Sequence, residues 1–245
     1  ADTPNHFAIN ILPDKKVAFE QALSDKGLAA SEFYPMVRGR LTHINGVNVD
    51  DIYPEDDAPN ALKRELNLTW SSHLTEDEAL SKGQWFDENS VNENAISMES
   101  ELARRLKLNI GDSITFNIAG TDTVTKVKNF RDVKWENFRP NFYVVFADGV
   151  INDFHHTYIN SFYLPPTESR WLIEMNQQFK AVTIIEIDQI LKQVREILTQ
   201  TSVAVEAILA LVLICAMVLM FATLLSTLSL RKHEAALYRT FGASK

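Results

Sequence analysis

The chain has 245 residues, enough for one large domain or two modest ones. Its 32 acidic residues outnumber its 24 basic ones, and no basic cluster is interleaved with aromatic residues. Proteins that hold nucleic acid by its phosphates need a basic face, so the composition argues against a nucleic-acid partner.

The first part of the chain, up to residue 94, mixes helix and strand signals. Aromatic and β-branched residues over 6–12 predict a strand, and Pro13 then begins a helix that ends at Gly27. Asn45-Gly46 is typical of a hairpin turn and lies in a loosely alternating stretch. We further expect a loop over 50–60, a strand over 67–70 and an irregular polar segment to residue 94.

The next part, up to residue 187, is richer in apolar strands. Ser97 and Glu101 predict the start of a helix, and Thr167 predicts the start of another that runs to about Phe179. Because helices and strands mix throughout, the fold class is α+β, and we expect one domain over 1–186. The predicted strands cover 113–118, 123–133, 141–146, 157–164 and 181–187.

The segment 187–206 predicts a long amphipathic stalk helix. Its apolar residues recur every three or four positions, so they share one helix face that needs a partner. No Pro or Gly follows before residue 230, and we therefore expect one continuous rod from Asp188 to Leu230. A rod that carries motion and a rod that merely tethers the domain both remain open. The stalk residues are Ile190, Leu191, Val194, Ile197 and Leu198.

The segment 207–230 contains no charged residue and predicts a transmembrane helix. Its 24 residues would span about 36 Å, enough to cross a hydrocarbon core of about 30 Å. The alternative is a buried core helix, which rarely runs so far without a charge. Arg231, Lys232 and Arg239 follow the span, so the positive-inside rule places 231–245 in the cytoplasm and 1–206 outside. The single cysteine, Cys215, lies in the span.

The tail, 231–245, predicts a short helix followed by a break. Gly242 can end the helix, and Ser244 is a good cap for a further one. The chain also begins at Ala1 without an initiating Met. From these features we expect a fragment of a larger membrane protein.

The candidate enzyme signatures are weak. Asp153 with His155 and His156 could ligate a metal, but adjacent residues of a strand point to opposite faces. The acidic stretch 50–57 could bind calcium or be a solvated loop, and the Ser-Ser-His sequence at 71–73 lacks a nucleophile elbow. We therefore predict no catalytic, cofactor-binding or metal-binding residue, and a protein that is not an enzyme.

The pattern R-x-x-E-x-x-x-x-R-x-x-G-A-S directly after the span resembles the FtsX-like permease family, the permeases of MacB-type (type VII) ABC transporters. Four longer segments, FYPMVRGRLTHING, RELNLTW, VKWENFRPNFYVVF and DQILKQVREILTQ, are similar to the second repeat of the YbbP-type permeases, described as predicted ABC exporter permeases. The resemblance covers essentially the whole chain and implies a multi-span permease of the bacterial inner membrane with a periplasmic domain.

The resemblance implies that the tail is a coupling helix docked on a cytoplasmic ABC ATPase dimer. That partner would bind ATP and Mg, because this chain has no phosphate loop and needs no cofactor of its own. The other half of the permease would lie in the same full-length polypeptide. The residues implied in ATPase coupling are Arg231, Glu234, Leu237, Tyr238, Arg239, Gly242, Ala243 and Ser244.

The resemblance leaves the substrate open. The family includes lipoprotein extractors, drug and peptide exporters, and mechanotransmitters that activate cell-wall hydrolases without transport. The YbbP type is associated with a periplasmic lipase-like hydrolase, which suggests a lipid or another hydrophobic substrate. The aromatic residues Trp135, Phe138, Phe142 and Tyr143 could line a surface for such a substrate or a partner, or could pack in the core.

Overall fold

A computed structural model describes residues 3–54, 59–75, 77–187 and 205–225, together with residues 192, 199, 200 and 202. The chain divides into two compact units, Ala1–Ile187 and Asp188–Lys245. The first unit is built on an 11-stranded sheet with helices packed against parts of it, so the predicted mixture of helices and strands is confirmed.

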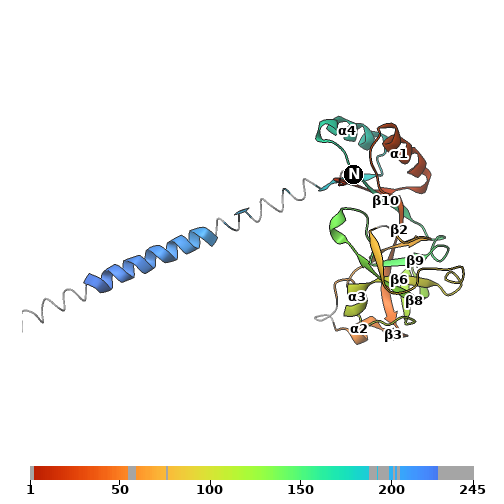
Figure 1. The fold of residues 1–245 in the computed structure, drawn as a ribbon, viewed down its shortest axis with the longest axis horizontal. Coiled ribbons are helices and arrows are strands. Elements are labelled where there is room, and N and C mark those ends of the chain that lie inside the picture. Colours follow the sequence, from red (N-terminus) through yellow and green to blue (C-terminus); the bar gives the residue numbers. More distant parts are fainter. Residues whose placement is uncertain are drawn as a thin grey trace, which may run out of the picture. The chain divides into compact units, whose positions relative to one another are not determined.

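The first group of elements brings together strands from the start and the end of this unit (Figure 1). A central strand, β1, pairs antiparallel with β10 on one side and β11 on the other, with His6 opposite Glu186. Two helices, α1 and α4, cover this sheet and share a core with it through Ala8, Phe19 and Phe162. The bounds are β1 (His6–Ile11), α1 (Pro13–Asp25), β10 (Thr157–Phe162), α4 (Ser169–Gln178) and β11 (Thr183–Glu186).

The second group of elements forms the larger core. The long strand β2 links the two groups, since it pairs with β10 at its start, β4 in its middle and β7 at its end. The core includes Leu41, Leu68 and Phe116, all fully buried. The bounds are β2 (Tyr34–Ile44), β3 (Val47–Asn48), α2 (Val49–Ile52), β4 (Leu66–Ser71), β5 (Glu78–Gly83), β6 (Ala95–Glu99), α3 (Ser100–Arg105), β7 (Ser113–Ile118), β8 (Thr121–Val133) and β9 (Val144–Ala147).

Several sequence predictions were wrong in detail. The predicted loop over 50–60 begins inside helix α2, because the Asn48 side chain caps that helix by accepting a hydrogen bond from Asp50 N at 2.9 Å. The irregular segment before residue 94 contains strand β5. Ser97 lies in strand β6 rather than at a helix start, since Glu99 is the residue that caps α3. Thr167 lies in a short 3-10 turn, η2 (Pro166–Glu168), before α4.

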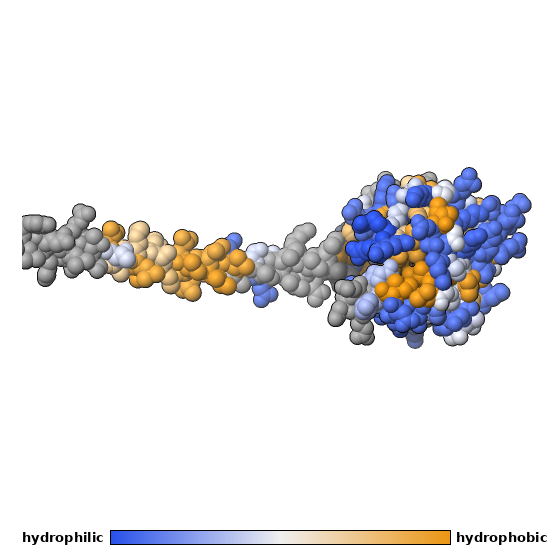
Figure 2. All heavy atoms as spheres, turned by 90° about the horizontal axis from the view of Figure 1, so that it is seen from below, coloured by the Kyte–Doolittle hydropathy of each residue, from blue (hydrophilic) through white to orange (hydrophobic). Residues whose placement is uncertain are grey.

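The second unit contains one described helix of notable composition, Val205–Leu225. It has 21 residues, its most apolar 18-residue stretch has a mean hydropathy of 3.0, and none of that stretch is buried within the chain. Its length is about 32 Å, so it is long and apolar enough to cross a membrane. Figure 2 shows apolar side chains along the helix. Residues 226–230 of the predicted span lie outside the described residues.

Candidate functional site

Of the four aromatic residues that stand out in the sequence, two lie in one loop and two directly follow it. We call residues 134–141 the aromatic loop; it joins β8 to β9 and contains the short 3-10 turn η1 (Trp135–Asn137). Trp135 is 45% exposed, and its ring lies 4.7 Å from that of Tyr143. Phe142 is instead buried and packs with Met36 and Val145, so it belongs to the core rather than to a surface.

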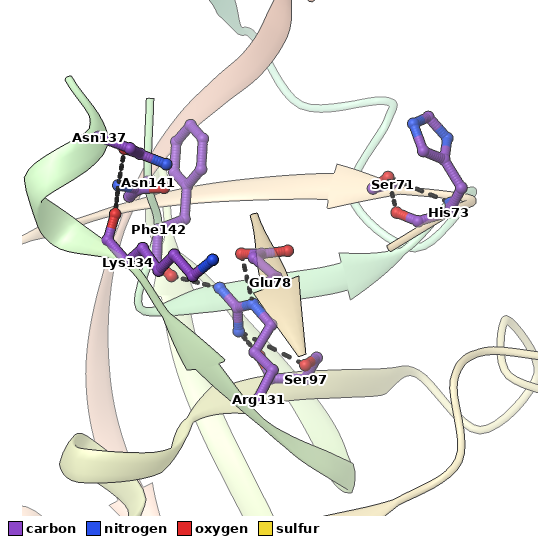
Figure 3. Close-up of polar contacts among 9 residues, drawn as sticks. All are labelled: Ser71, His73, Glu78, Ser97, Arg131, Lys134, Asn137, Asn141 and Phe142. Carbon is purple, nitrogen blue, oxygen red and sulfur yellow. Dashed lines mark hydrogen bonds and ion pairs between the residues drawn. The ribbon is translucent and has the colours of Figure 1, made fainter. Parts of the chain in front are cut away.

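A buried arginine fixes one end of the aromatic loop, as Figure 3 shows. The Arg131 side chain is fully buried, and its Nε donates to Glu78 Oε1 at 2.8 Å. Its Nη1 donates to the carbonyl oxygen of Ser97 at 3.1 Å, and its Nη2 donates to the carbonyl oxygen of Phe142. Burial lowers the pKa of the Arg131 guanidinium, while the neighbouring Glu78 carboxylate raises it. Arginine nevertheless stays protonated, so one hydrogen-bonded charge links β5 and β6 to Phe142, the residue that directly follows the loop.

Hydrogen bonds within the aromatic loop hold its shape. Asn141 Nδ2 donates to the carbonyl oxygen of Lys134 and to Asn137 Oδ1, each at 3.0 Å, which joins the two ends of the loop (Figure 3). Asn137 Oδ1 also accepts from Arg139 N at 3.0 Å, and the Arg139 side chain pairs with Asp77 at 2.5 Å. Phe138 has a φ of 51°, a conformation that places this aromatic residue at the sharp turn of the loop.

An apolar groove lies between the aromatic loop and the sheet of the first group of elements. Ala8 of β1 faces the core under α1 and α4, so its neighbours Phe7 and Ile9 point to the opposite face of the strand. The groove has a volume of about 370 Å³ and is open to solvent. Its apolar walls are Phe7, Ile9, Ile159 and Ile185 from the strands, with Trp135, Phe138 and Pro140 from the loop.

A polar hollow of about 380 Å³ adjoins this groove. Its walls include the exposed side chains of Arg38, Arg64 and Glu65. Trp135 and Asn141 line both the hollow and the groove, so the two spaces share a wall. The arrangement offers charged groups next to an apolar surface.

The sequence indicated only part of this site. It drew attention to Trp135 and Phe138 but missed Arg131 and the strand residues that complete the groove. Phe7, Ala8 and Ile9 are all apolar, so strand β1 is apolar on both faces. That signal could have indicated a second apolar contact for β1, although not which loop would provide it.

The side chains considered for catalysis do not form a catalytic pair. Ser71 Oγ donates to the backbone carbonyl of His73 at 2.6 Å, whereas the imidazole points away from it (Figure 3). That ring contacts Glu32 Oε2 at 3.1 Å. His156 Nδ1 lies 2.9 Å from the carbonyl oxygen of Phe154. No group of three or more His, Cys, Asp or Glu able to hold a metal occurs among the residues that the structure describes.

Two sets of predicted site residues fall outside the described part of the chain. These are the stalk residues Ile190, Leu191, Val194, Ile197 and Leu198, and the coupling residues between Arg231 and Ser244. Their proposed roles therefore remain predictions from the sequence.

Comparisons with known proteins identify a clear relative. No protein-family model matches the chain. A protein of Escherichia coli (strain K12), described as the uncharacterized ABC transporter permease YbbP, is 34% identical over 250 residues. The match covers 100% of this chain but only 29% of that protein, so the chain spans less than a third of its relative.

A solved domain of a permease protein from Porphyromonas gingivalis is also similar, with 13% identity and a TM-score of 0.31. The match covers 67% of this chain and 74% of the solved domain. A TM-score this low supports no inference. The sequence match alone carries the conclusion: over its whole length, this chain is related to an ABC transporter permease.

Proposed function

We propose that this chain is part of the permease of a MacB-type ABC transporter, which couples ATP hydrolysis by a partner ATPase to conformational change outside the membrane. The observation that carries the proposal is the match of this whole chain to part of an ABC transporter permease. A helix long and apolar enough to span a membrane, Val205–Leu225, supports it. The folded unit up to Ile187 is then periplasmic and the tail from Arg231 cytoplasmic.

In this proposal the chain itself hydrolyses nothing. A cytoplasmic ATPase dimer binds ATP and Mg, and its closure moves the coupling helix 231–240. The stalk passes that movement to the folded unit. The ATPase must bind one stalk arrangement more tightly than the other, because a partner shifts a conformational equilibrium only by its differential affinity. The other half of the permease completes the transport path.

The proposed substrate is a lipid or another hydrophobic compound. The apolar groove beside the aromatic loop supports this proposal, because half-buried apolar walls favour an apolar ligand. A periplasmic lipase-like hydrolase is the proposed recipient. This function needs a groove that can be filled and emptied, and the open side of the groove permits both.

The test is to purify the full-length permease with its ATPase from the native membrane and to identify bound lipids by mass spectrometry. Enriched lipid that is released when ATP is added supports extraction. The matched pair of variants is Arg239→Glu, in the coupling tail, and Arg170→Glu, on the exposed surface of α4. Only Arg239→Glu should abolish ATP-dependent release. Release without ATP dependence would contradict the proposal.

The stalk has a separate test. A helix-breaking substitution, Gln193→Pro, costs about 3 kcal/mol or more in a helix interior and should interrupt the rod. We expect ATPase activity to continue while movement of the folded unit, measured by fluorescence transfer between labelled sites, is lost. Movement that persists in this variant would favour the simple tether.

A second function, mechanotransmission to a periplasmic partner protein, is favoured by a different surface. Val47, Ile52 and Ile110 are 48%, 39% and 46% exposed, respectively. Asn45 Nδ2 donates to Asp112 Oδ1 at 3.1 Å, which brings the turn before β3 to the turn that contains Ile110. Figure 2 looks onto the end of the unit where α2 and β3 lie and shows apolar surface there. A stoichiometric protein bound to the permease, without enriched lipid, would support this function instead.

A further inference from the structure

The apolar groove and the polar hollow differ in chemistry but meet at the aromatic loop. Trp135 and Asn141 line both spaces. The hollow contributes two guanidinium groups, from Arg38 and Arg64, and one carboxylate, from Glu65. Within the described part of the chain, these three side chains form no ion pair with another residue. They are therefore available to a ligand.

We propose that the two spaces together bind a single-chain phospholipid with a zwitterionic headgroup. The acyl chain lies in the apolar groove against Phe138 and the strand residues. The phosphate contacts Arg38 and Arg64, and the ammonium group contacts Glu65. This inference rests on the proposed function in one respect, because it requires that the folded unit encounters membrane lipid.

The volumes favour one chain and a large headgroup. Small-molecule pockets have volumes of about 300–1,000 Å³, so the groove, with about 370 Å³, lies near the lower limit. It suits one acyl chain better than the two of a membrane phospholipid. The polar hollow, with about 380 Å³, is as large as the groove and offers more room than a lone carboxylate needs.

The charges favour a headgroup that carries both signs. Guanidinium groups bind phosphate by paired, charge-assisted hydrogen bonds. A purely anionic ligand would meet the Glu65 carboxylate in the same hollow, and like charges repel. An ammonium group next to the phosphate turns that repulsion into attraction. A neutral single-chain alcohol would leave all three charged groups without a partner.

The experiment uses the 245-residue chain in lipid nanodiscs with a lysophosphatidylethanolamine that carries a photoreactive group in its acyl chain. After illumination, the labelled peptides are identified by mass spectrometry. We expect labelling of the aromatic loop and of β1. Unlabelled lysophosphatidylethanolamine should compete best, lysophosphatidate should compete several-fold less well, and dodecanol should not compete. Labelling confined to the apolar helix 205–225 would overturn the proposal.

Variants assign the roles of the three charged side chains. The double variant Arg38→Gln, Arg64→Gln should reduce labelling of the groove about 10-fold, because it removes charge-assisted contacts in a partly exposed site. Glu65→Gln should weaken competition by lysophosphatidylethanolamine but not by lysophosphatidate. The matched control is Arg40→Gln, the next exposed arginine on β2, which lines neither space. An equal loss in this control would contradict the assignment.

The acyl-chain site has its own variant. Phe138→Asn removes the aromatic side chain, and asparagine tolerates the left-handed backbone found at this position better than most residues. Labelling should fall while thermal unfolding stays unchanged. This inference and the proposed function can fail separately. Lipid release driven by ATP without labelling of the groove refutes only the inference, whereas labelling without ATP-driven release refutes only the transport function.

Discussion

The folded unit and the apolar helix differ in where they place charged side chains. The folded unit encloses a complete guanidinium, that of Arg131, which has no exposed surface. The helix Val205–Leu225 has one charged residue, Glu206, near its start, and none from Ala207 to Leu225. Its side chains are nevertheless exposed throughout, with Leu213 at 63% and Ile214 at 54%.

The difference shows that burial within the chain and avoidance of charge are separate properties. Arg131 is acceptable in a core because Glu78, Ser97 and Phe142 satisfy its donors. The helix has no such partners among the described residues, and its composition fits a solvent that cannot hydrate charge. The same physical rule therefore explains the buried arginine and the uncharged surface.

The largest effect is expected when the buried charge pair is broken. Arg131→Leu leaves the Glu78 carboxylate, only 9% exposed, without its partner and leaves the carbonyl of Phe142 without its donor. Breaking a buried pair costs about 3–5 kcal/mol, so the free energy of unfolding should fall by about that amount. Chemical denaturation followed by near-ultraviolet circular dichroism measures it.

A double variant provides the control for this prediction. Arg131→Leu with Glu78→Leu removes both charges and should recover part of the lost stability, because replacing a whole buried pair is often neutral. If the single and double variants were equally unstable, the loss would reflect packing rather than an unpaired charge.

A charge placed in the apolar helix should have the next largest effect. Ile214→Arg lies near the middle of the helix, where an arginine raises the free energy of membrane insertion by about 2.5–3.5 kcal/mol. We expect a smaller membrane-integrated fraction in a translocation assay. Val17→Arg, on the exposed face of α1, is the matched control and should leave insertion and folding unchanged. If the Ile214 variant inserted as fully as the parent chain, the predicted cost of a charge at the middle of this helix would be contradicted.

A glycine pair separates close packing from backbone strain. Gly83 and Gly46 both have a positive φ, but a Cβ at Gly83 would lie 2.5 Å from the carbonyl oxygen of Lys128, whereas one at Gly46 meets nothing within 4 Å. Gly83→Ala should therefore lower the free energy of unfolding by about 1–3 kcal/mol more than Gly46→Ala. Equal effects in thermal unfolding would show that β5 can move away from β8 without penalty.

Much of the fold could be predicted because local signals and final structure agree. The apolar alternation of β7 and β8, the Asn45-Gly46 turn and the Pro13 start of α1 all have local physical causes. Strand β5 was missed because it is an exposed edge strand with few apolar residues. Its place is determined by backbone pairing with β8 and by the contact of Glu78 with Arg131, neither of which is a local property.

The candidate site was less predictable for the same reason. The aromatic residues stand out in the sequence, yet only the fold distinguishes the buried Phe142 from the exposed Trp135. The walls of the groove come from strands more than a hundred residues apart, such as β1 and β10. The sequence also gave no sign that Arg131 would be buried, because arginine is almost always a surface residue.

The smallest expected effect concerns a charged pair at the surface of the folded unit. Hydrogen bonds from Lys128 and Ser90 hold the pKa of Asp87 below its ordinary value. The Asp87 carboxyl therefore binds a proton less tightly in the folded state than in the unfolded state. Its contribution to the free energy of unfolding is present above the ordinary pKa of about 3.9 and is lost as pH falls through the lower pKa of the folded state. Asp87→Asn should flatten the decline of the melting temperature in that acidic range. Lys128→Met should flatten the decline as well, because it removes the other partner of the Asp87–Lys128 pair. An unchanged decline in this variant would show that another group causes the acid sensitivity.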